Sequence, residues 1–312
     1  MKILVSGAGA IGCLFGGALA LAGHEVCLYV RHADKASYIR NNGLVLSDIY
    51  TGEDVKVRVS VCEDPREFSP DICLLCVKAY DTEAAAAQLA AVDGDFPVIS
   101  LQNGVGNQEA LARHIALERL LLSIVYVGSR PAGEPGHMIW SGPGKVILAP
   151  ADASAMAAAE EAARLLCLPR LNIRAKAVTE AELRHILWEK LIVNSVVNPL
   201  TAIYGVVNGK LLEMAETVDL AAQLIAEAVA VANRRGAGLT VAGLQERVRE
   251  VCHDSATNRS SMLVDVNEGR RTEIDYINGA ICRIAAEEGL SAPTHELVWR
   301  KIRELTDAAE EK

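Results

Sequence analysis

The chain has 312 residues, of which 51% are hydrophobic and 23% are charged, and its formal net charge at pH 7 is −9. This length is enough for two domains with a sizeable core. The negative charge argues against a general nucleic-acid or anionic-membrane surface, so an anionic ligand has to be attracted by local Lys or Arg side chains.

The first thirty-one residues predict a strand at 2–6, a helix at 13–21 and a second strand at 24–30. Strand, glycine-rich turn, helix and strand form the unit that binds a dinucleotide. In that unit the first glycine makes a tight turn, the second lets a pyrophosphate approach the backbone, and the third lets helix and strand pack closely. Free N–H groups at the helix start then face the phosphates. The residues predicted to form this turn are Gly7, Ala8, Gly9, Ala10, Ile11 and Gly12.

Two other interpretations of the same stretch stay open at this point. One is a tight strand–helix turn without a ligand. The other is a secretory signal peptide, because Lys2 is followed by an apolar run and by Ala18-Leu-Ala20. Cleavage there would delete the strand and the helix that the glycine motif requires.

The residue after the second strand selects the cofactor. An NAD site usually has Asp or Glu there, which accepts hydrogen bonds from the ribose hydroxyls. Arg31 cannot accept a hydrogen bond, whereas its guanidinium fork suits a 2′-phosphate. We therefore expect NADP(H). The alternative is a solvated surface arginine, since Asp34 is nearby.

Alternating strands and helices continue up to residue 178. After a short polar helix, strands are expected at 43–47, 54–61, 71–77, 97–101 and 120–127, with helices at 82–91 and 154–167. A loop at 128–136 precedes a hairpin-type connection between 137–140 and 145–148, and 171–173 could close the sheet. Because carboxyl ends of strands line the ligand crevice of a doubly wound sheet, topology places Lys78, Gln102 and Asn103 towards the cofactor.

The eight cysteines are scattered along the chain, which fits free thiols in a reducing cytoplasm. Cys73 and Cys76 form the only C-x-x-C pair, inside the strand-like run 71–77. Residues three apart on a strand point to opposite faces, so this pair could not share a metal, and no metal is expected. Apart from the glycine-rich start, no uncharged apolar run reaches the roughly 20 residues of a membrane-spanning helix.

Strand patterns disappear from Thr179 onward. Thr179-Glu-Ala-Glu182 is a capping-box signature, and long amphipathic stretches follow it to the C-terminus. We therefore predict an α/β fold in which an N-terminal Rossmann-type doubly wound domain, residues 1–178, is followed by an all-α domain, residues 179–312.

The helix predicted at 183–198 is mostly apolar but is interrupted by Lys190, Asn194 and Asn198, whose spacing of four puts them on one helical face. A buried ammonium group needs a partner, and no carboxylate lies three or four residues from Lys190 on this helix. The stripe could face solvent or an interdomain water layer. Alternatively, it lines a cleft, where the lysine protonates a developing alkoxide and the amides orient a substrate carbonyl or carboxylate.

Residues 258–279 read as two helices joined near Gly269, with polar side chains between apolar anchors. Glu273 could be the missing partner of Lys190. The alternative for Glu273 and Asp275 is that both are first-turn carboxylates that favour a helix dipole.

The sequence resembles the ketopantoate reductase (2-dehydropantoate 2-reductase) family. The matching segments follow the family's order and spread over nearly the whole chain. The segments that carry the resemblance are Gly7-Ala-Gly-Ala-Ile-Gly12, Val77-Lys-Ala-Tyr80, Leu101-Gln-Asn-Gly104, Trp188-Glu-Lys-Leu-Ile-Val-Asn194, Asn198-Pro-Leu-Thr201, Ser260-Ser-Met262 and Thr272-Glu-Ile-Asp275. The resemblance implies a Rossmann domain, an all-helical domain, and NADPH-dependent reduction of 2-dehydropantoate to pantoate, a step towards coenzyme A.

The resemblance also implies roles for individual residues. Lys190 would be the general acid, and Glu273 would fix Lys190 or the nicotinamide end of the cleft. Asn103 would contact cofactor and substrate, while Arg31 and Lys78 would hold the adenosine-phosphate end. The residues implied to bind substrate are Asn194, Asn198 and Ser261, with Asn208 as a further candidate.

Alternative functions stay open at this level. The chain could reduce another 2-oxo or 3-hydroxy acid with NADP(H), or it could be a non-catalytic NADP(H) sensor, which needs the Rossmann half but not Lys190 with Glu273. The sequence does not set the oligomeric state, and a homodimer stays open.

Overall fold

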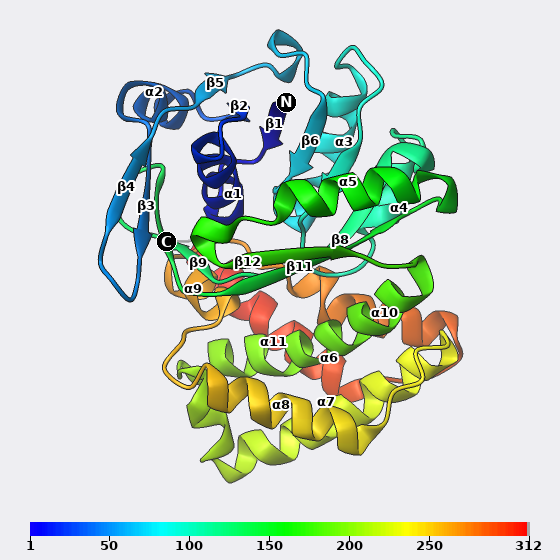
Figure 1. Cartoon of the computed structure of the whole chain (residues 1–312). Coiled ribbons are helices and arrows are strands. Elements are labelled where there is room, and N and C mark those ends of the chain that lie inside the picture. Colours follow the sequence, from blue (N-terminus) through cyan, green and yellow to red (C-terminus); the bar gives the residue numbers. More distant parts are fainter. Residues whose placement is uncertain (311–312) are drawn as a thin grey trace. The chain divides into compact units, whose positions relative to one another are not determined.

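The computed structural model describes residues 1–310. The chain divides into two compact units, shown together in Figure 1. The first unit comprises residues 1–103 and 107–183, and the second comprises the tripeptide 104–106 with the chain from 184 onward. None of the described helices is both long and apolar enough to cross a membrane.

The first unit is built on an eight-stranded sheet in the order β12-β11-β8-β7-β6-β1-β2-β5. All neighbours pair in parallel except β8 and β11. From β5 to β8 the strands follow the order 3-2-1-4-5-6 of the dinucleotide-binding fold. The strands are β1 (Lys2–Ser6), β2 (Glu25–Tyr29), β5 (Ser60–Cys62), β6 (Ile72–Leu75), β7 (Val98–Ser100), β8 (Leu120–Tyr126), β11 (Gly144–Pro150) and β12 (Ile173–Ala177).

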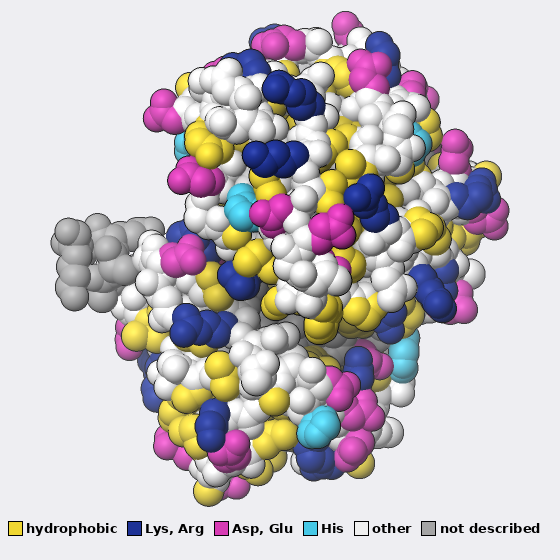
Figure 2. All heavy atoms as spheres, turned by 60° about the vertical axis from the view of Figure 1, so that its left-hand side comes forward, with side chains coloured by type: hydrophobic (Ala, Val, Ile, Leu, Met, Phe, Trp, Pro, Cys, Tyr) yellow, Lys and Arg dark blue, Asp and Glu magenta, His cyan; other side chains and the backbone are white. Residues whose placement is uncertain are grey.

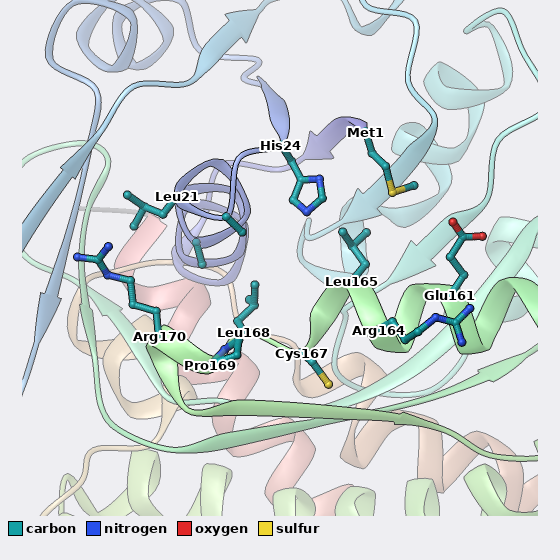
Figure 3. Close-up of a pocket in the computed structure, with 12 residues that line it drawn as sticks. Met1, Leu21, His24, Glu161, Arg164, Leu165, Cys167, Leu168, Pro169 and Arg170 are labelled. Atoms are coloured by element: carbon teal, nitrogen blue, oxygen red, sulfur yellow. The ribbon is translucent and has the colours of Figure 1, made fainter.

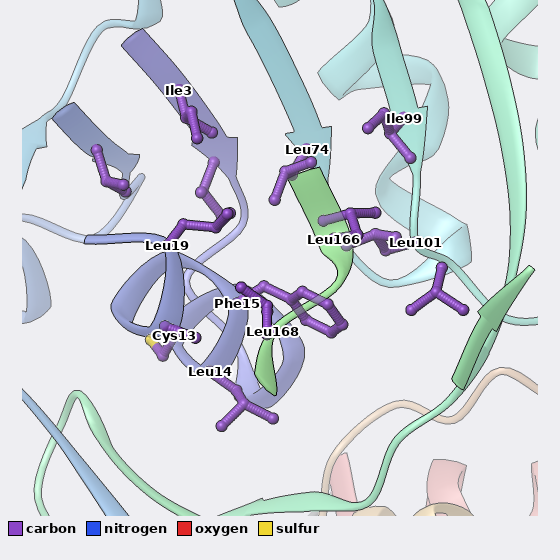
Figure 4. Close-up of a cluster of buried hydrophobic side chains, with 14 of the residues drawn as sticks. Ile3, Cys13, Leu14, Phe15, Leu19, Leu74, Ile99, Leu101, Leu166 and Leu168 are labelled. Carbon is purple, nitrogen blue, oxygen red and sulfur yellow. The ribbon is translucent and has the colours of Figure 1, made fainter. Parts of the chain in front are cut away.

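Helices cover both faces of this sheet, which confirms the doubly wound prediction. Helices α1 (Ala10–Leu21), α2 (Ala33–Asn42) and α5 (Met156–Leu166) pack on one face, where Phe15 is fully buried (Figure 4). Helices α3 (Thr82–Ala90) and α4 (Asn107–Ala112) pack on the other. Cys73 belongs to the apolar cluster under α3 and α4, whereas Cys76 packs against the cluster under α1, α2 and α5. Their side chains therefore lie on opposite faces, as predicted.

A second sheet of four strands has the order β4-β3-β10-β9. Its strands are β3 (Leu44–Asp48), β4 (Asp54–Val57), β9 (Ser129–Pro131) and β10 (His137–Trp140). The single strand predicted over 54–61 is therefore wrong, because β4 pairs antiparallel with β3 whereas β5 pairs in parallel with β2. An alternating pattern shows which side chains are half-buried but not which sheet they join.

The predicted hairpin between 137–140 and 145–148 is also wrong. β10 pairs with β3 and β9, while β11 pairs with β8 and β12, so the chain passes from one sheet to the other at this glycine-rich connection. The segment predicted as a loop, 128–136, contains the short strand β9. Glycine and proline mark the turns correctly here, but they do not determine the pairing partners.

The second unit is helical, and no strand follows β12 in the described chain. Its helices are α6 (Glu180–Tyr204, of which residues from 184 belong to this unit), α7 (Ala215–Arg234), α8 (Val241–Asp254), α9 (Ser261–Asn267), α10 (Asn278–Glu287) and α11 (Pro293–Glu310). Ile192, Val196 and Leu200 of α6 are fully buried in the core of this unit.

The predicted capping box starts α6. The Thr179 N–H donates to Glu182 Oε2 over 2.9 Å, and the Glu182 N–H donates to Thr179 Oγ1 over 3.3 Å. These reciprocal bonds satisfy backbone donors at the helix start that have no partner within the helix.

Acidic and basic side chains are interspersed over the face of the molecule shown in Figure 2. On that face the basic side chains do not gather into one broad patch.

Candidate functional site

The turn between β1 and α1 has the geometry that its glycines predict. Gly7 has a φ of +106°, and a Cβ there would lie 2.8 Å from the backbone N of Val77. A Cβ on Gly12 would overlap the carbonyl oxygen of Gly7. Both positions therefore require glycine on steric grounds, whether or not a ligand binds.

Gly9 differs from these two, because it is not needed for packing. A Cβ at Gly9 would meet nothing within 4 Å, and Gly9 has an ordinary extended backbone at the N-cap of α1. No side chain caps this end of α1, and its first turn carries no acidic residue. Backbone N–H groups at a helix start, next to an open position at Gly9, suit an anion such as a pyrophosphate.

Arg31, the predicted 2′-phosphate residue, is paired with Asp81 and not with the nearby Asp34. Its Nη1 and Nη2 donate to Asp81 Oδ1 and Oδ2 over 3.2 and 2.7 Å. The hydrogen bonds and charge of Asp81 raise the pKa of Arg31 above its usual value. Asp81 was not identified from the sequence, and the only available signal was its position just after Lys78-Ala-Tyr80.

The three residues predicted at strand ends differ in burial. Lys78 is partly buried directly before the short helix η2 (Ala79–Asp81). Gln102 is buried, and its amide donates to Val77 O over 3.0 Å and to Thr82 Oγ1 over 2.7 Å. Its side chain therefore holds the ends of β6 and β7 together.

Asn103 is partly buried at the end of the first segment of the first unit. Its carbonyl oxygen accepts a hydrogen bond of 2.9 Å from Asn107 Nδ2. The next three residues belong to the second unit, in which the Val105 N–H donates to Tyr276 O over 3.1 Å. Asn103 is thus joined covalently to the tripeptide 104–106, which is hydrogen-bonded to Tyr276. Tyr276 is three residues after Glu273 in the chain.

Lys190, Asn194 and Asn198 form the polar face of α6 that their spacing predicts. All three are partly exposed, whereas the residues between them are almost completely buried. α6 therefore presents one ammonium and two amide side chains on an otherwise apolar surface.

Glu273 acts electrostatically on Lys190. Burial lowers the pKa of Lys190 to about 8, and the Glu273 carboxylate opposes that shift. Glu273 itself is 7% exposed and lies just before the short helix η7 (Ile274–Tyr276). A lysine with a pKa near neutrality can both hold and release a proton at the pH of a cell.

The structure separates the roles of the neighbouring residues Ser260 and Ser261. The side chain of Ser261, which was the predicted ligand residue, is exposed. Ser260 is buried: its hydroxyl caps α9 and is hydrogen-bonded to Thr201 Oγ1 at 2.6 Å and to the Asn198 carbonyl oxygen at 3.4 Å. The serine directly before a helical stretch was the sequence signal for that capping role.

Asn208 is buried away from solvent. Its N–H donates to Asn258 O over 3.0 Å, and its Nδ2 donates to Ser255 Oγ over 2.8 Å. Its Oδ1 has no hydrogen-bond partner among the described residues. These contacts hold the short helix η6 (Asn208–Leu212) against the turn that follows α8.

The first unit also has a pocket of about 380 Å³, which is distinct from the predicted site residues (Figure 3). Met1 and His24, which line it, directly precede β1 and β2, so it lies at the amino ends of these strands. The glycine turn and Arg31 follow the carboxyl ends of the same strands. None of the predicted site residues lines this pocket.

A Rossmann unit with a glycine-rich turn, followed by a helical unit that holds a lysine of lowered pKa, fits the class of NAD(P)-binding reductases. Residues 3–153 match the family model described as ketopantoate reductase PanE/ApbA, and residues 182–306 match the model of its C-terminal region. The chain belongs to the ketopantoate reductase family.

Curated relatives and solved structures agree with this assignment. The chain is 34% identical to a 2-dehydropantoate 2-reductase of Archaeoglobus fulgidus and 30% identical to one of Pyrococcus horikoshii, in each case over 97% of both chains. It superposes with a TM-score of 0.87 on the PanE/ApbA family ketopantoate reductase from Ralstonia eutropha, at 30% identity over 99% of this chain and 100% of that one. The ternary structure of D-mandelate dehydrogenase with NADH and anilino(oxo)acetate gives a TM-score of 0.91 at 26% identity, over 99% of both chains.

Proposed function

We propose that this protein reduces 2-dehydropantoate to pantoate with NADPH. The observation that carries the proposal is Lys190, an ammonium group with a pKa of about 8 on the polar face of α6, influenced by the buried carboxylate of Glu273. Family membership supplies the reaction class, because the curated relatives are named 2-dehydropantoate 2-reductases.

The residues of the first unit fit a dinucleotide. The N–H groups at the start of α1 and the open space at Gly9 would hold the pyrophosphate. Arg31, with Lys78, would hold the adenosine-phosphate end, which favours NADP(H) over NAD(H). Asn103 would contact both cofactor and substrate. Gln102 would act through its hydrogen bonds, which fix the end of β7 beside this region.

The bound dinucleotide supplies the hydride that the substrate's carbonyl carbon accepts. Lys190 donates a proton from Nζ to the carbonyl oxygen as negative charge develops there, and is left as a neutral amine. At pH 7 a lysine with this pKa is protonated roughly ten to one, so the acid form is the abundant one. Glu273 keeps that form populated, because its charge opposes the effect of burial.

The amide groups of Asn194 and Asn198 are spaced one helical turn apart beyond Lys190. In this proposal they orient the carboxylate and the carbonyl of the substrate, since amide N–H groups donate to oxygen acceptors. Ser261 would contribute through its exposed hydroxyl at the start of α9, and Asn208 through the hydrogen bonds that hold η6 in place.

The direct test follows NADPH consumption by absorbance with the purified protein and a panel of 2-oxo acids. We expect kcat/KM to be highest for 2-dehydropantoate, with pantoate as the product. Tight NADPH binding without oxidation by any acid of the panel would contradict the proposal and would support a non-catalytic sensor.

A second candidate is the reduction of another 2-oxo acid, one with an aryl group. The likeness to D-mandelate dehydrogenase favours it, because that protein's structure has NADH and anilino(oxo)acetate bound. The panel should therefore include phenylglyoxylate, the 2-oxo acid that corresponds to mandelate. A higher kcat/KM for phenylglyoxylate than for 2-dehydropantoate would replace the first candidate by the second.

A further inference from the structure

The Arg31–Asp81 pair combines an arginine, which is typical of NADP sites, with a carboxylate, which is typical of NAD sites. Arg31 lies two residues after β2, and Asp81 is the last residue of η2, which follows β6. Both are in the first unit, and two parallel hydrogen bonds connect them. Their side chains are 45% and 25% exposed, so the pair lies at the surface, where a ligand can reach it.

We infer that Asp81 is a specificity-determining residue, which reduces the enzyme's discrimination between NADPH and NADH. The inference rests on the proposed function, in that it takes the glycine turn to bind the dinucleotide. A residue just beyond β2 is next to the 2′ position of the bound ribose in this fold. An arginine there selects a 2′-phosphate, whereas a carboxylate selects free hydroxyl groups.

The hydrogen-bonding capacity of the pair allows it to serve both cofactors. A guanidinium group has five N–H donors, and Asp81 uses two of them, so three remain for the oxygens of a 2′-phosphate. A carboxylate has about four acceptor sites, so Asp81 can still accept from ribose hydroxyl groups while it binds Arg31.

The charges oppose each other where a phosphate would bind. Arg31 alone would attract a 2′-phosphate, but the Asp81 carboxylate, 2.7 Å from Nη2, brings the net charge of the pair to zero. Asp81 also repels the phosphate directly, while the neutral 2′-hydroxyl of NADH is not repelled. Asp81 therefore weakens NADPH binding selectively.

The experiment measures Kd for NADPH and NADH by fluorescence titration, which does not depend on the identity of the 2-oxo acid. Asp81→Asn removes the negative charge and keeps an oxygen that can accept from Arg31. We expect the Kd of NADPH to fall about twofold to fivefold, the range for a partly exposed charge, while the Kd of NADH stays the same or rises. Asp81→Ser is a second variant with the same expected direction.

The matched control is Glu83→Gln, which removes an exposed carboxylate two residues away, one that pairs with Arg113 and not with Arg31. This variant should leave the ratio of the two Kd values unchanged. If the ratio of the NADPH Kd to the NADH Kd is the same in Asp81→Asn as in Glu83→Gln, the inference is overturned.

Arg31→Gln separates the inference from the proposed cofactor. If Arg31→Gln weakens NADPH much more than NADH while neither Asp81 variant changes the ratio, the inference fails and the NADPH assignment stands. If Arg31→Gln weakens the binding of NADPH and NADH equally, both the inference on Asp81 and the NADPH assignment fail. A wild-type protein that binds neither dinucleotide would overturn the proposed function and this inference together.

Discussion

Asn278 donates a hydrogen bond from Nδ2 to the carbonyl oxygen of Ser195, over 3.0 Å. Pro199 leaves that carbonyl without its usual helical partner, because a proline four residues further on has no N–H. The same Nδ2 lies 3.1 Å from Nδ1 of His295, whose Nε2 lies 2.9 Å from the Leu224 carbonyl oxygen. α6 thus continues through Pro199 because a buried side chain of α10 supplies the missing donor.

The first prediction concerns the stability of this arrangement. Asn278→Ala should lower the free energy of unfolding by about 1–3 kcal/mol, because it leaves the buried Ser195 carbonyl without a donor. Pro199→Ala restores a backbone N–H at the position that can bond this carbonyl, so the cost of Asn278→Ala should be smaller in that background. Urea denaturation of the two single variants and the double variant measures the coupling.

Asn267→Ala is the matched control, because this asparagine is exposed at the end of α9. It should change the free energy of unfolding by less than about 0.5 kcal/mol. Equal costs of Asn278→Ala with and without Pro199 would show that the hydrogen bond does not compensate for the proline.

The second prediction is a pH dependence from His295, which is 0% exposed. Burial lowers its pKa to about 4 from an ordinary value of 6.5. The unfolded chain therefore binds more protons than the folded chain between pH 6.5 and pH 4, and stability falls as pH falls through that window, by about 3 kcal/mol in total.

Denaturation at pH 4.5 and pH 7 gives the difference in the free energy of unfolding between the two pH values. In His295→Gln, the part of this difference that comes from His295 should be absent. His253→Gln serves as the control, because the His253 side chain is 86% exposed. A wild-type protein whose stability changes no more steeply than that of His295→Gln over this range would contradict the prediction.

The sequence predicted the elements that depend on local patterns. Strand β1, the glycine turn and α1 follow from a contiguous pattern, and the Thr179–Glu182 capping box depends on residues three apart. The division of 54–62 between two sheets could not be predicted, because β4 pairs with its neighbour β3 whereas β5 pairs with β2, which lies much earlier in the chain. Periodicity reports burial, and long-range pairing needs information that the periodicity does not contain.

The candidate site follows the same rule. The face formed by Lys190, Asn194 and Asn198 was predictable because a spacing of four is a helical property. The pairing of Arg31 with Asp81 was not, because the two residues are fifty positions apart and meet only through the order of β2, β1 and β6.

The third prediction separates two glycines of the turn. Gly9→Ala should keep the thermal stability of the protein, because its Cβ would meet no atom within 4 Å, yet it should weaken dinucleotide binding, because the methyl group would occupy the space proposed for the pyrophosphate. Gly12→Ala should lower both, because its Cβ would overlap the Gly7 carbonyl oxygen. Thermal unfolding and NADPH titration distinguish them. Unchanged NADPH affinity in Gly9→Ala would place the phosphates elsewhere.

The fourth prediction is kinetic. Lys190→Ala should lower kcat by about 10²–10⁴-fold, the usual contribution of a positioned general acid, and should change the Kd of NADPH far less. In the wild type, the rate of reduction should fall as pH rises above about 8, because Lys190 loses its proton there. Lys210→Ala, which removes an exposed lysine paired with Glu213, should leave both the rate and the pH profile unchanged. Near-normal turnover in Lys190→Ala would exclude the proposed role.

The fifth prediction tests the carboxylate that influences Lys190. Glu273 opposes the effect of burial, so Glu273→Gln should lower the pKa of Lys190 further and move the alkaline fall of kcat to lower pH. Glu268→Gln is the control, because Glu268 is an exposed carboxylate of the same segment that pairs with Arg270. A residue that only stabilised the fold would lower the rate without moving the profile. An alkaline limb that stays in place, or that moves to higher pH, would therefore show that the Glu273 charge does not act on the proton donor.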